Sequence, residues 1–214
     1  MQTETLGLRE RKKKQTRERI AHVATLLFIE RGFDEVTIAE IADAVPVSKM
    51  TITNYFPLKE DLVFDAHADL VEDLADSVRT RRPGESALDA LRRGHADALD
   101  ARLSTSGHCS PGFARLVHDS PRLRAHERAF DERREAALAR ALAEETGAAA
   151  DDPLPSLAAA QFTAAHRVLH ARMRSLIRAG LPDRAANQRL AGVAETAFAL
   201  LEPALGDYCR RPAE

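Results

Sequence analysis

The chain has 214 residues, a length that favours a small domain fused to one of medium size. Hydrophobic residues make up 44% and charged residues 30%, which are ordinary values for a soluble globular protein. The N-terminus has no apolar signal core, and no apolar run approaches the roughly 18 residues of a membrane span. We therefore expect a cytoplasmic protein without a membrane segment, in which Cys109 and Cys209 are reduced thiols.

The formal net charge of −2 neither favours nor excludes nucleic acid as a partner, but the distribution of the charges is informative. A cluster of basic side chains near the N-terminus suits contact with phosphate. A solvated helix start with no partner explains the same cluster, so this alternative stays open. The basic residues of the cluster are Arg9, Arg11, Lys12, Lys13, Lys14, Arg17 and Arg19.

The first predicted helix runs from about residue 11 to residue 31, after a polar tail. Apolar residues recur at helical spacing and form one stripe. Gly32 follows the last helical residue, where glycine commonly ends a helix. The stripe consists of Ile20, Val23, Ala24, Leu27 and Phe28.

Two short helices are predicted next. Thr37 and Glu40 form a T-x-x-E capping box, which starts a helix that ends near residue 44. After a turn of sequence Val-Pro-Val, Ser48 caps a third helix over about 49–54. A proline after Phe56 then breaks the chain.

The remainder of the chain also has helical patterns and no strand pattern, so we predict an all-α fold. A long helix is expected from residue 59 or 60 to about residue 82. Residues 104–112 are the clearest loop. Further helices are expected after a Ser86–Asp89 cap and over about 113–118, 121–145, 155–179 and 184–208.

Two short helices joined by a tight turn, the second beginning with a capped polar sequence, are typical of a helix-turn-helix. Val47 and Ile52 would anchor the second helix on the core. Ser48, Lys49, Thr51, Thr53 and Asn54 would point outward, and such side chains can reach base edges or phosphates in a major groove. A plain three-helix bundle that binds no DNA is the alternative.

The segment from Thr16 to Leu62 resembles the DNA-binding domain of the TetR family of repressors. The resemblance implies an N-terminal helix-turn-helix domain over 9–58 and a helical ligand-binding and dimerisation domain over 59–210. The matching elements, in order, are Arg31-Gly32-Phe33, Val36-Thr37-Ile38, Ile41-Ala42, Val47-Ser48-Lys49 and Tyr55-Phe56-Pro57-Leu58-Lys59-Glu60-Asp61-Leu62.

The resemblance also implies roles for individual residues. Thr37 and Tyr55 would contact backbone phosphate. Lys59 would do so near the start of the fourth helix, where the helix dipole also favours an anion. Phosphate contacts would fix the register, while the start of the third helix would read bases. The expected DNA-contacting residues are Thr37, Ser48, Lys49, Met50, Thr51, Thr53, Asn54, Tyr55 and Lys59.

The chain departs from the family pattern in this segment. Pro46 stands where the turn usually has glycine, Met50 where a small residue is common, and Thr53 where an aromatic residue is common. These departures bear on the base preference rather than on the fold. Over 86–135 the composition is similar to actinobacterial members of the family, in particular to a subgroup resembling the mycofactocin regulator.

In TetR-like proteins the region after the fourth helix binds an inducer and forms the dimer. Two apolar stripes on the last two predicted helices would build a four-helix bundle with a second copy under two-fold symmetry. The alternative is that both stripes serve only the core of one chain. They consist of Ala158, Ala159, Phe162, Ala165, Leu169 and Met173, and of Leu190, Val193, Ala197, Phe198 and Leu201.

An inducer pocket is expected in the same region, and its ligand is expected to be an apolar or amphipathic small molecule. His166 and His170 are four residues apart, a spacing that can bind a metal, and His108, Cys109 and His118 would be further ligands. A polar pocket wall or partly exposed histidines explain the same residues, and no metal or cofactor is predicted. The expected ligand-binding residues are Phe113, Leu116, Phe130, Phe162, His166, Leu169 and His170.

We therefore expect a dimeric repressor that a small-molecule inducer releases from a palindromic operator, through a tilt of the long 59–82 helix. A ligand-independent repressor or architectural DNA-binding protein is the alternative, and a purely protein-binding helical module is a third. No enzyme is expected, because the chain has no nucleophile elbow, phosphate-binding glycine loop or H-E-x-x-H motif.

Overall fold

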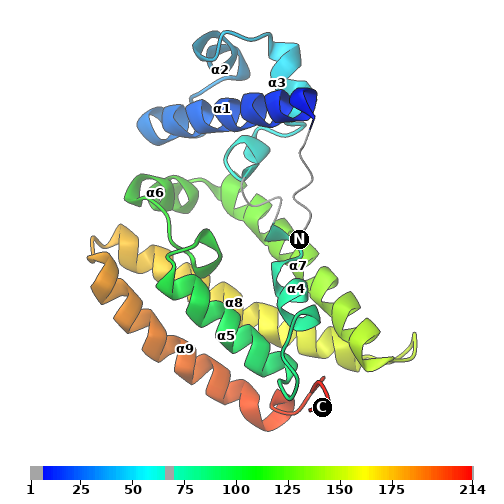
Figure 1. Cartoon of the computed structure of the whole chain (residues 1–214). Helices are drawn as coiled ribbons and strands as arrows, with labels where there is room; N and C mark the ends of the chain where they lie inside the picture. Colours follow the sequence, from blue (N-terminus) through cyan, green and yellow to red (C-terminus); the bar gives the residue numbers. More distant parts are fainter. Residues whose placement is uncertain (1–6, 66–69, 214) are drawn as a thin grey trace. The chain divides into compact units, whose positions relative to one another are not determined.

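The structure, a computed structural model, describes residues 7–65 and 70–213, and every regular element within these ranges is a helix (Figure 1). The expected all-α fold is therefore confirmed. None of the described helices is both long enough and apolar enough to span a bilayer. The α-helices are α1 Leu8–Arg31, α2 Ile38–Ala44, α3 Lys49–Tyr55, α4 Asp73–Arg79, α5 Ala87–Asp100, α6 Pro111–Asp119, α7 Pro121–Thr146, α8 Leu154–Arg178 and α9 Asp183–Leu205.

The chain forms two compact units. The first unit comprises Met1–Ala68 together with Arg115–Arg124, and the second comprises Asp69–Ala114 together with Ala125–Glu214. A single boundary after residue 58 is expected from the sequence, whereas the first unit extends to Ala68 and the chain returns to it at the end of α6 and the start of α7. Both α6 and α7 therefore carry residues of both units.

The core of the first unit is built on the predicted apolar stripe of α1. Ile20, Ala24 and Phe28 are fully buried, and the Phe28 ring packs on Phe33 with the ring centroids 5.0 Å apart. The helix ends at Arg31 as predicted, because Gly32 adopts a positive φ of 94° and donates its N–H to the Phe28 carbonyl.

The prediction of one long helix over 59–82 is wrong for the described part of that segment. A 3-10 helix covers only Glu60–Leu62, and α4 covers Asp73–Arg79, while residues 66–69 lie outside the described ranges. Leu62, Val63 and Phe64 are all buried, and one face of an α-helix cannot bury three consecutive side chains. The segment is therefore not one rigid helix that could tilt. The release mechanism that depends on such a tilt is not compatible with this structure.

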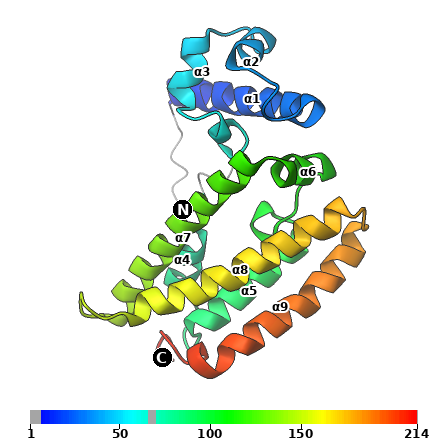
Figure 2. The same cartoon turned by 180° about the vertical axis from the view of Figure 1, so that it is seen from behind.

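The core of the second unit lies between α5, α8 and α9, which run side by side in both views (Figures 1 and 2). The predicted Ser86–Asp89 capping box starts α5. The predicted helices near 113–118, 121–145, 155–179 and 184–208 are confirmed as α6 to α9. The largest fully buried side chains of this unit are Leu88, Leu138, Leu142, Leu169, Met173 and Leu190.

The predicted loop at 104–112 packs tightly on α8. It begins with the 3-10 helix Ser104–Ser106, and His170 on α8 donates from Nε2 to the Ser104 carbonyl over 2.9 Å. Gly107 follows with a φ of 89°, and a Cβ atom at this position would lie 2.7 Å from the His170 carbonyl oxygen. Only glycine allows both this backbone conformation and this close approach.

Candidate DNA-binding surface and ligand cavity

The first candidate site is the pair of helices α2 and α3. The predicted capping box is present, since Thr37 Oγ1 accepts the N–H of Glu40 and the Glu40 carboxylate accepts the N–H of Thr37. These hydrogen bonds and the guanidinium of Arg31 lower the pKa of Glu40 to about 2. The start of α2 is therefore held by local contacts, as the sequence predicts.

The third helix is capped and anchored as the sequence predicts. Ser48 Oγ accepts the N–H of Thr51 over 3.0 Å and lies 2.8 Å from the Thr51 hydroxyl. Ile52 is fully buried, and Val47 is half-buried and donates its N–H to the Ala42 carbonyl. Ile52 is thus the fully buried side chain that anchors α3 on the core.

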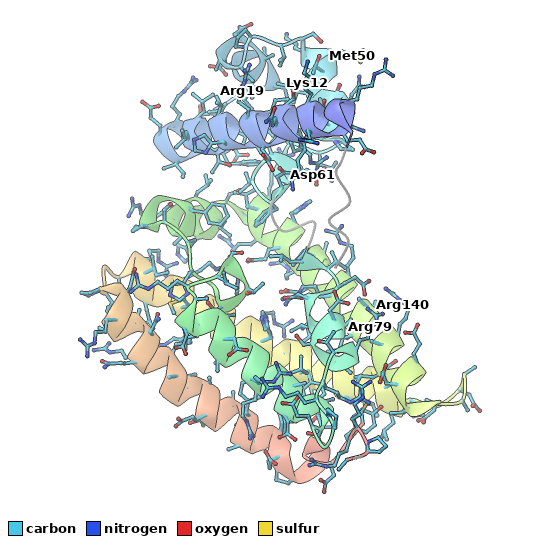
Figure 3. The ribbon with its side chains drawn as sticks, in the orientation of Figure 1. Lys12, Arg19, Met50, Asp61, Arg79 and Arg140 are labelled. Carbon is cyan, nitrogen blue, oxygen red and sulfur yellow. The ribbon has the colours of Figure 1, made fainter. Side chains whose placement is uncertain are left out.

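Most of the predicted DNA-contacting residues of α3 are exposed. Met50 stands on the outer side of the helix and is 68% exposed (Figure 3). Thr51 and Tyr55 are half-buried, and Thr53 donates its hydroxyl to the Met50 carbonyl. The exposed members of the set, with Thr37, are Ser48, Lys49, Met50, Thr53 and Asn54.

Lys59 differs from the other residues of the predicted set. Its Nζ donates to the Phe33 carbonyl over 2.5 Å and lies 4.5 Å from the centroid of the Phe33 ring. Burial lowers the pKa of Lys59. In this structure the ammonium group ties two segments of the first unit together, so a phosphate contact for Lys59 stays a prediction that requires this contact to open.

The basic cluster of α1 divides into two groups. Arg17 binds Asp65 over 2.6 Å and donates to the carbonyl of Tyr55, and Arg19 donates to the carbonyl of Val45. These two arginines hold the ends of α3 and α2 by their backbone. The other basic residues of the cluster, Arg9, Arg11, Lys12, Lys13 and Lys14, are exposed, and Lys14 lies 3.9 Å from Glu18 one turn along the helix.

A residue that the sequence did not single out also belongs to the first unit. Arg122, in the first turn of α7, binds Glu60 over 3.0 Å and Asp34 over 3.9 Å. Its guanidinium also lies over the Phe33 ring. No local pattern predicts these contacts, because their partners lie far away in sequence.

The second candidate site is a cavity of about 310 Å³ within the second unit. Its walls are mainly apolar, and every lining residue comes from that unit. Cavities of this size and character commonly bind small molecules. The lining residues are Asp73, Leu74, Ser77, Leu91, Gly94, His95, Asp97, Ala98, Ala101, Leu103, Thr105, Phe162, His166 and Phe198.

A charged network forms one wall of this cavity. Arg134 on α7 is buried and binds both oxygens of Asp73 through NH2, at 2.8 and 2.6 Å. Its other terminal nitrogen lies 3.1 Å from Nδ1 of His166, which must accept because a guanidinium only donates. Burial, followed by the charge of Arg134, lowers the pKa of His166 well below its usual range, so this ring is neutral at pH 7.

The structure places the predicted ligand-binding residues in different surroundings. Phe162 and His166 line the cavity, whereas the other five predicted residues are not part of its wall. Leu169 is buried in the core, and Leu116 belongs to the first unit. The cavity also contains His95 and Asp73, which no local sequence pattern marks as ligand-binding residues. No group of three potential metal ligands occurs within residues 7–65 and 70–213.

The apolar stripes predicted for the dimer interface mostly serve the core of a single chain. Ala158, Phe162, Met173, Leu190 and Phe198 are all buried within it. The structure thus favours the alternative reading of these stripes. The large apolar side chains that α8 and α9 leave exposed are Leu154, Leu157, Val168 and Leu200.

The two capped helices α2 and α3, together with a separate helical unit that encloses a cavity, define a helix-turn-helix transcriptional regulator. The family model described as bacterial regulatory proteins of the tetR family matches residues 20–66. The HTH-type transcriptional regulator TcmR of Streptomyces glaucescens is 30% identical over 175 residues, which covers 76% of this chain and 75% of that protein. The chain belongs to the TetR family.

Solved structures agree with this assignment at the level of the fold. NalD of Pseudomonas aeruginosa is 18% identical with a TM-score of 0.55, covering 88% of this chain and 96% of that chain. FadR of Thermus thermophilus, solved in complex with lauroyl-CoA, is 25% identical with a TM-score of 0.51, covering 86% and 92%. The chain is thus a transcriptional regulator, while the mycofactocin subgroup stays a prediction.

Proposed function

We propose that this chain is a repressor that binds a palindromic operator as a homodimer and leaves it when a small molecule occupies the cavity of the second unit. The observation that carries the DNA-binding part is the exposed polar face of α3, which Ser48 caps and Ile52 anchors. A helix held in this way can enter a major groove without rearranging its own domain.

The dimer is supported by apolar side chains that the single chain leaves uncovered on α8 and α9. Leu157, Val168 and Leu200 are each more than half exposed. Burying such residues against a second copy removes apolar surface from water and presents two recognition helices to a two-fold symmetric site. This pairing uses the outer faces of α8 and α9 rather than the predicted stripes.

The inducer response is supported by the cavity and by the course of α7. The cavity is large enough for a small molecule, and FadR, a structural relative, is described in complex with lauroyl-CoA. Helix α7 begins in the first unit with Arg122 and continues in the second unit with Arg134, which faces the cavity network. We propose that ligand binding alters the position of this continuous helix and thereby the presentation of α3.

An electrophoretic shift assay with the DNA flanking the protein's own gene tests the proposal. We expect a retarded band for the full chain. Lys49→Ala should lower the affinity for this DNA at least tenfold, and Arg128→Ala, at an exposed position on α7, should leave the affinity unchanged. Tyr55→Phe should weaken the band as well. Equal binding by the parent and both α3 variants would contradict the assignment of α3.

The same assay separates the alternatives. Release of the DNA by at least one compound in a small-molecule screen supports the inducible repressor. A stable complex that no compound affects supports a ligand-independent DNA-binding protein. A chain that retards no duplex at low salt is not a DNA-binding protein, and a protein-binding helical module would then explain the fold better.

A further inference from the structure

His95 is the unusual residue of the cavity. Its side chain lies on α5 and is only 7% exposed, yet neither ring nitrogen has a hydrogen-bond partner within the described part of the chain. The ring lies edge-on to His166 at 6.3 Å and 6.0 Å from the Phe198 ring, measured between centroids. A buried polar group without a partner is costly and rare, so its persistence beside a cavity indicates a partner that occupies that cavity.

The other polar groups around His95 already have partners. Asp73 is neutralised by Arg134, which also donates to Nδ1 of His166. Because Nδ1 of His166 accepts from Arg134, the proton of this ring is on Nε2, and the ring also has a backbone hydrogen bond with Thr105. Among the described residues, His95 is therefore a buried polar group of the wall whose two ring nitrogens are available to a ligand.

The charge of the ligand follows from these contacts. Burial lowers the pKa of His95, so the imidazole is neutral at pH 7 and offers one N–H donor and one acceptor nitrogen. An anion would have to approach the carboxylate of Asp97, while the charge of Arg134 is already matched by Asp73. A cation at the inner wall would lie near Arg134 and would lose its hydration among apolar side chains.

The volume and lining of the cavity suit a ligand with a ring system. Phe162 and Phe198 contribute aromatic faces, and Leu74, Leu91 and Leu103 complete an apolar lining. A volume of about 310 Å³ is at the lower end of ligand pockets, which suits a compact molecule of a few rings. Stacked or edge-to-face packing of a planar ligand on these side chains would be favourable.

We propose that the cavity binds a neutral aromatic molecule bearing a hydroxyl group, and that His95 recognises this hydroxyl. A phenolic hydroxyl can donate to the free acceptor nitrogen or accept from the N–H, so either ring tautomer is satisfied. The inference rests on the proposed function in one respect, namely that the occupant of this cavity is the inducer.

Three probes with one skeleton test the inference: naphthalene, 2-naphthol and 2-naphthoate. The chain has no tryptophan, so naphthyl fluorescence can be followed directly during titration of the full protein. We expect 2-naphthol to bind about tenfold more tightly than naphthalene, the difference that one satisfied hydrogen bond produces, and 2-naphthoate to bind most weakly.

Two substitutions locate the effect at His95. His95→Phe should reduce the preference for 2-naphthol over naphthalene to less than threefold, and His95→Gln, which can also donate and accept, should restore part of it. His22→Phe, at an exposed histidine of α1, should change nothing. Circular dichroism tests whether each variant is folded. If His95→Phe does not fold, the comparison of His95→Gln with the parent tests the role of His95.

The inference is overturned if the parent binds naphthalene and 2-naphthol equally, prefers 2-naphthoate or binds none of the probes. A preference that survives in a folded His95→Phe variant overturns the role of His95. All titrations are made without DNA. If the probes do not bind selectively but the protein still shifts its operator, only the proposed ligand class is wrong. If the probes bind selectively but the protein shifts no operator DNA, the proposed repressor function is wrong instead.

Discussion

At the residue scale, we expect the buried arginine of α7 to be the side chain whose substitution costs the most stability. Arg134 is 5% exposed and contacts both oxygens of Asp73, whose side chain is 19% exposed. Removing one member of such a pair leaves a buried charge without compensation, which is far more costly than removing an exposed pair. The Asp73–Arg134 pair therefore holds the wall of the cavity in place, and substitution of either residue should destabilise the protein.

We expect Arg134→Met to lower the free energy of unfolding by about 3 kcal/mol, because Asp73 is then left without its counter-charge. Urea unfolding followed by circular dichroism measures the change. Arg140→Met on the same helix is the matched control, since Arg140 is 60% exposed and its pair with Glu72 should contribute less than about 1 kcal/mol. Both Arg140 and Arg79, which also binds Glu72, are labelled in Figure 3. Equal losses from the two substitutions would contradict this account.

Lys59 shows how the environment changes the role of a residue type. Its place in the TetR-like segment predicts a phosphate contact, whereas its ammonium group is held by the Phe33 carbonyl and lies over the Phe33 and Phe28 rings. Lys49, with the same side chain, is exposed on α3. A local motif cannot distinguish these two lysines, because the partners of Lys59 are 26 and more residues away.

At the element scale, the loop that carries Leu103 and Thr105 to the cavity depends on one glycine. We expect Gly107→Ala to destabilise the protein by about 2–4 kcal/mol, because the new Cβ would meet the His170 carbonyl at 2.7 Å in addition to a strained positive φ. Thermal and urea unfolding report the loss.

Gly147 provides the control for this substitution. It also has a positive φ, of 62°, but a Cβ atom there would meet nothing within 4 Å. Gly147→Ala should therefore cost only the backbone strain, about 1–2 kcal/mol. If the two alanine variants are equally stable, the close approach of Gly107 to α8 does not matter for stability.

The helices themselves show which elements local sequence can predict. The starts of α2, α3 and α5 agree with their capping residues, because a cap is a contact between residues three positions apart. The segment after Pro57 was predicted wrongly, because its apolar residues suit a helical stripe as well as a buried turn. Burial of Leu62, Val63 and Phe64 by the rest of the first unit selects the turn.

At the scale of the whole molecule, the buried histidines make stability depend on pH. Burial lowers the pKa of His95 and, together with Arg134, His170 and His95, that of His166. Below pH 6.5 the unfolded chain binds protons at these residues that the folded chain does not, so stability falls as the pH falls. Each such histidine can contribute up to about 1.4 kcal/mol per pH unit.

We therefore expect the free energy of urea unfolding to decrease between pH 7 and pH 5. His166→Phe should reduce this slope, and His22→Phe should not, because His22 is exposed in the folded chain. The window is distinct from acid unfolding through Glu40 and Glu85, whose pKa values of about 2 affect stability only below about pH 4.5. Constant stability from pH 7 to pH 5 would argue against neutral buried histidines.

Dimerisation is the second property of the whole molecule that can be tested. We expect Leu200→Glu to convert the dimer into a monomer at micromolar concentration and to weaken operator binding, because Leu200 is 76% exposed on the proposed contact face of α9. Light scattering coupled to size-exclusion chromatography measures the mass. Leu26→Glu is the control, since Leu26 is 53% exposed on α1 and belongs to the first compact unit rather than the second.

The sequence by itself determined the features that depend on near neighbours. The stripe of α1, the glycine that ends it, the caps of α2 and α3 and the outward position of residues such as Met50 all follow from spacing along one helix or turn. They were sufficient for the all-α fold and for the helix-turn-helix, and the TetR-like pattern extends over the same segment.

Only the tertiary structure decided what distant side chains do together. Asp73 and Arg134 are 61 residues apart in sequence, and His95 meets His166 and Phe198 from three different helices. Periodicity identifies which face of a helix is apolar, but it does not say which helix covers that face or where a cavity is left. For the same reason the two stripes on α8 and α9 could serve a dimer or one core, and the packing of α9 against both α5 and α8 selected the core.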